Sequence, residues 1–407
     1  MKKILFVALP LVVAGCASTS NTTTSQVAVA APNAKAASSQ RQLFGFCQDD
    51  KWGYFDQTGK IVITPRFIGG KEFHDGRAWV VVENGTGHRP VDQSVNMIDE
   101  DGKIIVAYKS WHIDIEDFSG GLAAVAEDHH TYGFVDKSGS VAIPFQFGSV
   151  SKFSEGVCQV GVGGSREMKN GFIDVNGKYL FNPRPVNMTS FSEGLAAYSE
   201  GEDFYQDSDD STVSSKEGRC GFINKEGEIV IKPQFFFAAE FSDGMALVSV
   251  DSEIKKNGYI DKTGKMVIKP RFAHCGLFHE GLAPVEIGNT YGFMDKTGTV
   301  VIKPEFDSAI GFSEDMGIIR IGDSYGYIDR KGKIVINPQF VAAGPFVGGV
   351  AVVAEKHEGK ASGMVIIKKG LIDKQGRYVL KPIGTQQLGS SIVEILEARY
   401  AAKLLHG

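Results

Sequence analysis

The sequence predicts an all-β fold made of a tandem array of three-stranded antiparallel β-repeats. A D-x-x-G step recurs nine times, apolar strand-like stretches flank it, and two phenylalanine columns lie six residues apart after it. We expect the units to stack as an open β-solenoid with a C-terminal capping helix; a closed β-propeller is the alternative. The nine steps are Asp56/Gly59, Asp99/Gly102, Asp136/Gly139, Asp174/Gly177, Asn224/Gly227, Asp261/Gly264, Asp295/Gly298, Asp329/Gly332 and Asp373/Gly376.

Each D-x-x-G step is the turn of a predicted β-hairpin. Asp is favoured at the first position of a type I turn, and Gly takes the left-handed position that closes it. A glycine such as Gly258 comes three residues before most turns, with Asn96 in its place in the second copy. A proline such as Pro270 follows the second strand in most copies, and we expect it to end that strand because proline cannot donate to a sheet ladder.

The phenylalanine columns, as in Phe272/Phe278, are predicted core anchors. Three residues later a glycine such as Gly281 precedes a third strand, whose second position holds a small residue such as Ala283. The predicted unit is therefore a three-stranded meander of about 34–50 residues that must stack on its neighbours to bury its apolar face. We favour the open array, because blades usually need four strands and nine blades would be many for one ring.

These columns resemble the WG-repeat family, also called KWG repeats. Lys51-Trp52-Gly53 matches the naming motif literally, whereas most copies carry Tyr, Asn, Cys220 or Lys369 where Trp would stand. The resemblance extends from about Trp52 to Pro382. It implies a repeat array without a shared catalytic residue.

The N-terminus reads as an export signal. Met1–Cys16 has two lysines, an apolar run from Ile4 to Val13, and small residues before a cysteine. It resembles a bacterial lipoprotein signal, with Val13-Ala14-Gly15-Cys16 as the lipobox. The resemblance implies cleavage before Cys16 and lipidation of that residue with acyl chains such as palmitate. Ala17 after the cysteine favours the outer membrane, on either side of it; an ordinary cleaved signal peptide is the alternative.

The predicted domains are a signal peptide at 1–15, a lipidated cysteine and disordered tether at 16–40, the repeat array at 41–388, and a C-terminal helix at 389–407. The tether is rich in Ser, Thr, Asn, Ala and Gln and cannot bury enough apolar surface to order itself. Ser390–His406 has apolar residues at helical spacing and a capping box at Ser391 and Glu394. We expect this helix to cover an open sheet edge, or else to bind a partner.

Composition and motifs give little indication of nucleic-acid binding, catalysis or metal binding. A net charge of -5 gives no reason to expect nucleic acid. No G-x-S-x-G, H-E-x-x-H or P-loop occurs, and we expect no enzyme activity, no cofactor and no metal. The acidic residues of 202–210 lack the pattern of a calcium loop, and we interpret the turn aspartates and the His74 and His279 positions as structural, exposed turns. The pairing of Cys47, Cys158, Cys220 and Cys275 stays open.

Three tryptophans are the candidate ligand-binding residues: Trp52, Trp79 and Trp111. Exposed tryptophans stack on sugars or form hot spots for proteins, and packing at the N-terminal end of the array is the alternative. We predict a lipid-anchored binding scaffold of the cell envelope with a protein partner. A peptidoglycan or glycan binder is the first alternative, and a hydrolase with a loop-built site is the second.

Overall fold

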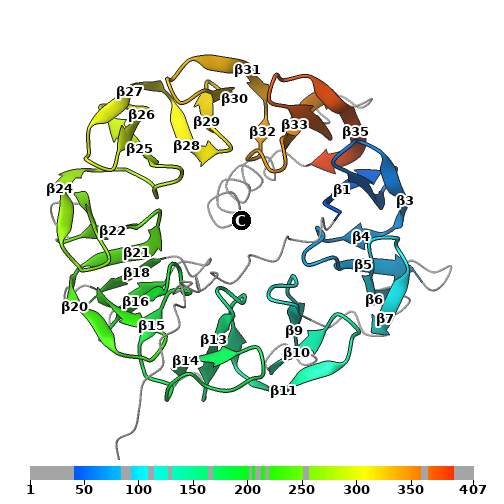
Figure 1. Cartoon of the computed structure of the whole chain (residues 1–407). Helices are drawn as coiled ribbons and strands as arrows, with labels where there is room; N and C mark the ends of the chain where they lie inside the picture. The colour runs from blue at the N-terminus through cyan, green and yellow to red at the C-terminus, as the bar shows by residue number, and fades with distance from the viewer. Residues whose placement is uncertain are drawn as a thin grey trace, which may run out of the picture. The chain divides into compact units, whose positions relative to one another are not determined.

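A computed structural model of the chain describes residues 41–83, 93–108, 114–126, 131–163, 168–200, 204–206, 212–215, 220–250, 256–358 and 365–388. The chain divides into two units, Met1–Ser39 and Gln40–Gly407, and every described residue belongs to the second. This unit is all-β. Its described strands form nine antiparallel sheets, which are the blades of a β-propeller (Figure 1).

The blades follow one another around the ring in chain order. Blade 1 contains β1 (Leu43–Gln48), β2 (Lys51–Asp56) and β3 (Ile61–Phe67), and blade 2 contains β4 (Gly69–Gly70), β5 (Ala78–Glu83), β6 (Gln93–Ile98) and β7 (Ile104–Tyr108). Blade 3 contains β8 (Asp114–Ile115), β9 (Leu122–Ala126), β10 (Tyr132–Asp136) and β11 (Val141–Phe147). Blade 4 contains β12 (Ser149–Val150), β13 (Val157–Val162) and β14 (Lys169–Asp174).

The second half of the ring has the same plan with one insertion. Blade 5 contains β15 (Asn187–Met188), β16 (Leu195–Ser199), β19 (Cys220–Asn224) and β20 (Ile229–Phe235). Blade 6 contains β17 (Phe204–Gln206), β18 (Thr212–Ser215), β21 (Phe237–Ser242), β22 (Met245–Ser249), β23 (Asn257–Ile260) and β24 (Met266–Phe272). Blade 7 contains β25 (Leu282–Ile287), β26 (Thr290–Asp295) and β27 (Val300–Phe306). Blade 8 contains β28 (Ser308–Ser313), β29 (Met316–Ile321), β30 (Ser324–Ile328) and β31 (Ile334–Phe340), and blade 9 contains β32 (Ala342–Ala343), β33 (Val350–Glu358), β34 (Val365–Asp373) and β35 (Tyr378–Leu388).

The open solenoid was the wrong choice and the propeller alternative is the observed fold. The third strand of each copy does not pair with the hairpin of its own copy. It pairs with the hairpin of the next copy, as in the Ala78↔Ile98 register of β5 and β6. The loop between the phenylalanine columns also contributes a short innermost strand, such as β32, so that most blades reach four strands. Every sequence repeat therefore spans two blades.

The ring closes where blade 9 meets blade 1. Phe46, Phe55 and Leu371 are buried together at this junction, although more than 300 residues separate Phe55 from Leu371. A closed ring has no open array end, so the reason for expecting a capping helix disappears. The described residues contain no helix, and 389–407 lies outside them. Consequently, no helix in the described part of the chain is long and apolar enough to cross a bilayer.

The D-x-x-G hairpin prediction is confirmed. The Gly264 N–H donates to the Asp261 carbonyl at 2.9 Å, and Gly264 has the left-handed φ of 83° that the closing position requires. Asp261 Oδ1 accepts hydrogen bonds from the backbone N–H groups of Thr263 and Lys265 at 2.9 and 3.1 Å. Asn224 Oδ1 accepts the equivalent bond from Glu228 N at 2.8 Å, which explains why Asn is tolerated there.

We expected proline to end the second hairpin strand, and this expectation was wrong. Pro270 lies inside β24, the outermost strand of its blade, where one edge needs no N–H donor. The bulge at this proline explains the glycine column: a Cβ on Gly258 would lie 2.4 Å from the Ile268 carbonyl oxygen. The second copy lacks both residues, and there Asn96 pairs regularly with Ala107.

The phenylalanine anchors are confirmed as core. Phe278 is fully buried and packs edge-on against Tyr259 of the preceding blade, with ring centroids 4.9 Å apart. Phe293 and Phe312 make the same edge-on contact, and the rings of Phe222 and Phe241 are tilted with centroids also 4.9 Å apart. The apolar core is therefore a series of clusters between neighbouring blades.

Candidate functional site

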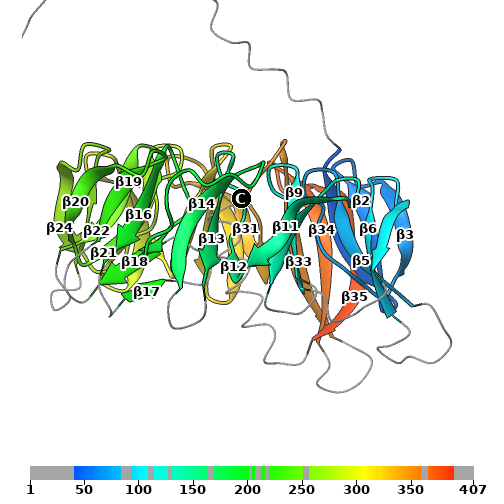
Figure 2. The ribbon, with the colours of Figure 1, turned by 90° about the horizontal axis from the view of Figure 1, so that it is seen from below.

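The two faces of the ring are built differently. We call the face with the D-x-x-G turns and the turns after the innermost strands the turn face, and the opposite face the loop face. Turns on the turn face keep one length from copy to copy. Connections on the loop face vary, from two residues between β25 and β26 to twenty between β16 and β19, which include β17 and β18. In the edge view, β17 and β35 reach the side opposite the tight turns (Figure 2).

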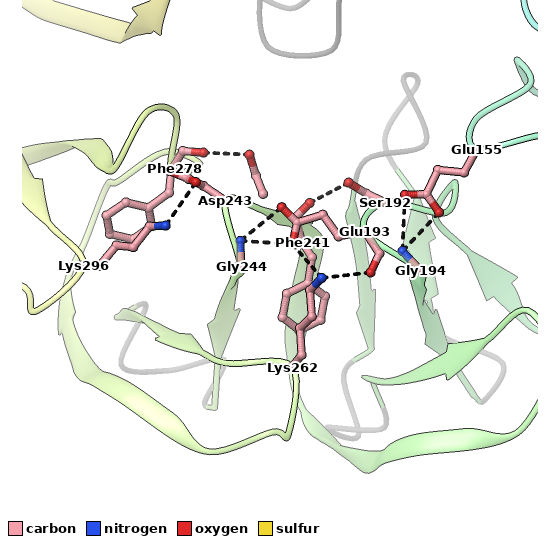
Figure 3. A network of polar contacts seen from close by, with 11 residues as sticks. Glu155, Ser192, Glu193, Gly194, Phe241, Asp243, Gly244, Lys262, Phe278 and Lys296 are labelled. Carbon is pink, nitrogen blue, oxygen red and sulfur yellow. Dashed lines mark hydrogen bonds and ion pairs between the residues drawn. The ribbon is translucent and has the colours of Figure 1, made fainter. Parts of the chain in front are cut away.

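A repeated polar contact joins neighbouring blades on the turn face (Figure 3). Glu193 of blade 5 accepts hydrogen bonds from Gly244 N of blade 6 at 3.1 and 3.0 Å. Lys262 of blade 6 pairs with the Glu193 carboxylate at 3.0 Å and donates to the Glu193 carbonyl at 3.0 Å. We call this arrangement the acidic clasp. It also joins Glu155 to Gly194 and Lys225, Asp243 to Gly281 and Lys296, Glu280 to Asp315 and Arg330, and Glu314 to Gly349 and Lys374.

The sequence analysis missed this clasp, although the sequence contains a signal for it. Where the acidic residue is missing, the basic residue is missing as well: Gly120 occurs with Val175, and Gly348 occurs with Gln57. The acidic position and the basic position are charged in the same pairs and uncharged in the same pairs, which indicates that the two positions are in contact. Here that contact is structural, because it joins the turns of neighbouring blades.

The serine before each acidic turn residue also crosses the blade junction. Ser242 Oγ donates to the Phe278 carbonyl of the next blade at 2.7 Å, and Ser192 Oγ donates to the Phe241 carbonyl at 2.6 Å. His279, at the same position in blade 7, is half-buried, and its ring would lie 3.2 Å from a Cβ on Gly311 of blade 8. These positions make junction contacts, so the expectation of an exposed turn was wrong for His279, whereas the His74 side chain is 41% exposed.

The structure separates the three candidate tryptophans. Trp79 is 2% exposed, stacks on Phe118 and donates from Nε1 to the Glu116 carbonyl at 3.0 Å. Trp79 therefore offers no ring face to a ligand. Trp52 is half-buried, with the Lys369 ammonium 5.9 Å from its ring centroid. Trp111 and Cys16 lie outside the described residues.

No cysteine pair or metal site emerges in the described ranges. Cys47, Cys158, Cys220 and Cys275 are all thiols, and burial raises the pKa of Cys220 to about 12 and that of Cys275 to about 11. The described residues contain no group of three or more His, Cys, Asp or Glu side chains placed to hold a metal ion. Most of the acidic 202–210 segment lies outside those residues.

The loop face exposes apolar side chains in one sector. Val250, Ile287 and Ile321 occupy the same position in blades 6, 7 and 8 and are 48%, 44% and 42% exposed. Blades 7 and 8 have two-residue connections here, whereas β33 and β34 of blade 9 have nine residues each against six in β29. Three extra residues correspond to about 10 Å of strand, so blade 9 projects beyond this sector.

The family model described as "WG containing repeat" matches seven segments of the chain: 52–85, 132–164, 171–202, 221–253, 258–291, 291–324 and 325–356. These segments cover more than half of the sequence. The chain belongs to the WG-repeat family.

The family model leaves two copies of this WG-repeat protein unmatched, the second and the ninth. The second contains Asn96 and no proline. The ninth contains Lys369 in the tryptophan column, and the Lys369 ammonium lies 3.2 Å from Glu72 Oε1 in blade 2. The unmatched copies thus lie close to the ring closure, where the regular contacts change.

No protein of curated function matches the WG-repeat sequence. Similar solved structures include BamB from Moraxella catarrhalis (11% identity, TM-score 0.34, covering 77% of this chain and 93% of that one). AztD from Citrobacter koseri gives 11% identity, a TM-score of 0.35 and coverage of 85% and 95%. Prolyl oligopeptidase B from Galerina marginata gives 9% identity, a TM-score of 0.40 and coverage of 79% and 51%. Likenesses this distant carry no functional conclusion.

Proposed function

We propose that this WG-repeat ring is a binding scaffold, without enzymatic activity, that holds a protein partner on its loop face in the bacterial cell envelope. The observation that carries the proposal is the confinement of length variation to that face. In repeat proteins, insertions gathered on one face commonly mark the binding face. The turn face is uniform, and its charged groups are engaged in the acidic clasp.

The apolar sector of the loop face is the surface that we assign to the partner. Ile287 and Ile321 stand on adjacent blades, and each is more than 40% exposed. Burial of exposed aliphatic surface by a partner is favourable, at about 25 cal/mol per Å² of apolar surface. Trp79 is buried and offers no support for the glycan-binding alternative.

The proposed anchor is a lipid on Cys16, which would place the protein at the outer membrane. Leu43, at the start of β1, lies opposite Asp56 of the first D-x-x-G turn, so the described chain begins on the turn face. Fractionation of cells that express Cys16→Ser tests this step: we expect the protein to move from the membrane to the soluble fraction, and unchanged membrane association would reject the anchor.

Site-specific photo-crosslinking in intact cells tests the binding face. A photoreactive amino acid would be placed at Ile287 or Ile321 and, as matched controls, at Val267 or Val301, which are 42% and 47% exposed on the outermost strands β24 and β27. We expect a discrete adduct from the loop-face positions alone. Adducts of equal yield from all four positions, or from the rim alone, would contradict the assignment of this face.

A further inference from the structure

Four charged side chains from three consecutive blades converge on the inner side of the ring. Lys71 and His74 follow the innermost strand β4, Asp117 follows β8, and Lys152 follows β12. Asp117 Oδ1 lies 3.7 Å from Lys71 Nζ, and Asp117 Oδ2 lies 3.6 Å from both His74 Nε2 and Lys152 Nζ. One carboxylate thus lies among two ammonium groups and an imidazole.

Positive charge exceeds negative charge in this cluster, and the cations face solvent. The Asp117 side chain is 9% exposed, whereas the side chains of Lys71, His74 and Lys152 are 40%, 41% and 51% exposed. With a neutral histidine the four groups sum to one positive charge. Lys71 also donates to the Ile115 carbonyl at 2.6 Å, which fixes its ammonium group in place.

Nearby acidic side chains are engaged elsewhere. Glu72 accepts a hydrogen bond from Gly45 N at 2.7 Å and pairs with Lys369, and Asp75 accepts one from Gly121 N at 2.8 Å. Glu116 is exposed and acts with Asp114 on Tyr132, whose pKa is raised by burial and by these two carboxylates. Glu72 and Asp75 thus make these contacts with partners other than Lys71, His74 and Lys152.

The cluster is a local feature of blades 2 to 4. The residue directly before the second phenylalanine is charged in these blades, as Glu72, Asp117 and Lys152. The same position holds Ser190, Leu277, Gly311 and Pro345 in blades 5, 7, 8 and 9, and Glu240 in blade 6, whose described ion pairs form no lysine cluster like that around Asp117. A contact needed to hold every blade junction together would recur around the ring, and this one does not.

We propose that Lys71, His74 and Lys152 form a binding site for a small anionic group, a carboxylate or a phosphate, on the inner side of blades 2 to 4. Ammonium groups bind such anions through charge-assisted hydrogen bonds, which are stronger than neutral ones. Asp117 holds the cations in place before the ligand arrives, which lowers the ordering cost of binding. The site is independent of the loop face.

Calorimetric titration of the full chain with inorganic phosphate and, separately, with citrate tests the site and shows which anion it prefers. We expect Lys152→Met to weaken binding about tenfold, and Lys152→Arg to retain most of it. The matched control is Lys262→Met, an equally exposed lysine of the acidic clasp, which should leave the affinity unchanged.

Two outcomes would overturn the proposal. One is the absence of saturable binding of either anion to the wild-type chain. The other is an equal loss of affinity in Lys152→Met and Lys262→Met, which would indicate non-specific attraction to basic side chains. Circular dichroism of each variant would establish that the ring is folded, and Lys152→Arg provides a folded comparison if Lys152→Met is unstable.

Discussion

Glu72 of blade 2 and Lys369 of blade 9 meet across the ring closure, with Lys369 Nζ 3.2 Å from Glu72 Oε1. Blade 1 has no innermost strand among the described residues, and these two side chains bind the exposed edge of β1 instead. Gly45 N donates to Glu72 Oε2 at 2.7 Å, and Lys369 Nζ donates to the Gly45 carbonyl at 3.4 Å. In blade 9 the equivalent carbonyl, on Val352, accepts from Gly344 N of the inner segment.

We therefore predict that Lys369→Met destabilises the ring by about 1–3 kcal/mol, because it removes the Lys369 hydrogen bond to the Gly45 carbonyl and the cation that pairs with Glu72. Urea unfolding followed by circular dichroism measures this. Lys303→Met, which removes an exposed lysine from an outermost strand, is the control and should change little. Equal midpoints for the two variants would show that the side chains do not stabilise the closure, and a double-mutant cycle with Glu72→Gln would measure their coupling.

The acidic clasp is predicted to stabilise each junction that contains it. Glu193→Ala removes the acceptor of Gly244 N and the ion-pair partner of Lys262, and we expect a loss of about 1–2 kcal/mol in the free energy of unfolding. Glu305→Ala, on the exposed edge of β27, is the control. If thermal denaturation gave the same Tm for both variants, the acidic clasp would not contribute to the stability of the ring.

Stability should fall in acid because of the hairpin turns. Side-chain hydrogen bonds from Thr263 and Thr297, followed by backbone N–H groups, lower the pKa of Asp261 and Asp295 below the ordinary value. A carboxyl group with a lowered folded pKa stabilises the fold above its unfolded pKa, near 4, and this stabilisation is lost as the pH falls through the folded pKa.

The double variant Asp261→Asn/Asp295→Asn tests this origin. An amide keeps the Oδ1 acceptor, as Asn224 does naturally, but does not titrate in this range. We expect its Tm to depend less on pH below about pH 4 than that of the wild type. Parallel Tm curves for the two proteins would place the acid sensitivity in other groups.

A buried tyrosine hydroxyl should stabilise the contact between neighbouring blades at three junctions. Tyr259 Oη donates to the Gly276 carbonyl of the next blade at 2.6 Å, and Tyr54 and Tyr327 make the same bond to Lys71 and Gly344. We expect Tyr259→Phe to cost about 1 kcal/mol, since it leaves a carbonyl unsatisfied. Phe293 occupies the equivalent position in blade 7, so the ring itself is accommodated without the hydroxyl. A Tyr259→Phe variant as stable as the wild type would indicate that water replaces the bond.

The sequence by itself determined the local structure. The Asp and Gly of the turns, the buried phenylalanine columns and the small residues of the third strand follow from φ preferences, burial and close packing within about ten residues, and the structure has each of them where the pattern predicts. The clasp was also within reach, since Gly120 with Val175 and Gly348 with Gln57 break both columns together. Its meaning required knowing that the two columns belong to adjacent blades.

Tertiary structure alone decided which copy pairs with which, and hence whether the array is open or closed. A hairpin pattern is the same whether the third strand pairs within its copy or with the next, because the strand's own residues face the same apolar surroundings in both cases. Closure depends on small rotations between blades that sum around the ring, and on contacts such as Lys369 with Glu72 that lie 297 residues apart. The uniform turn face, the variable loop face and the cation cluster around Asp117 exist only once neighbouring blades have packed against one another.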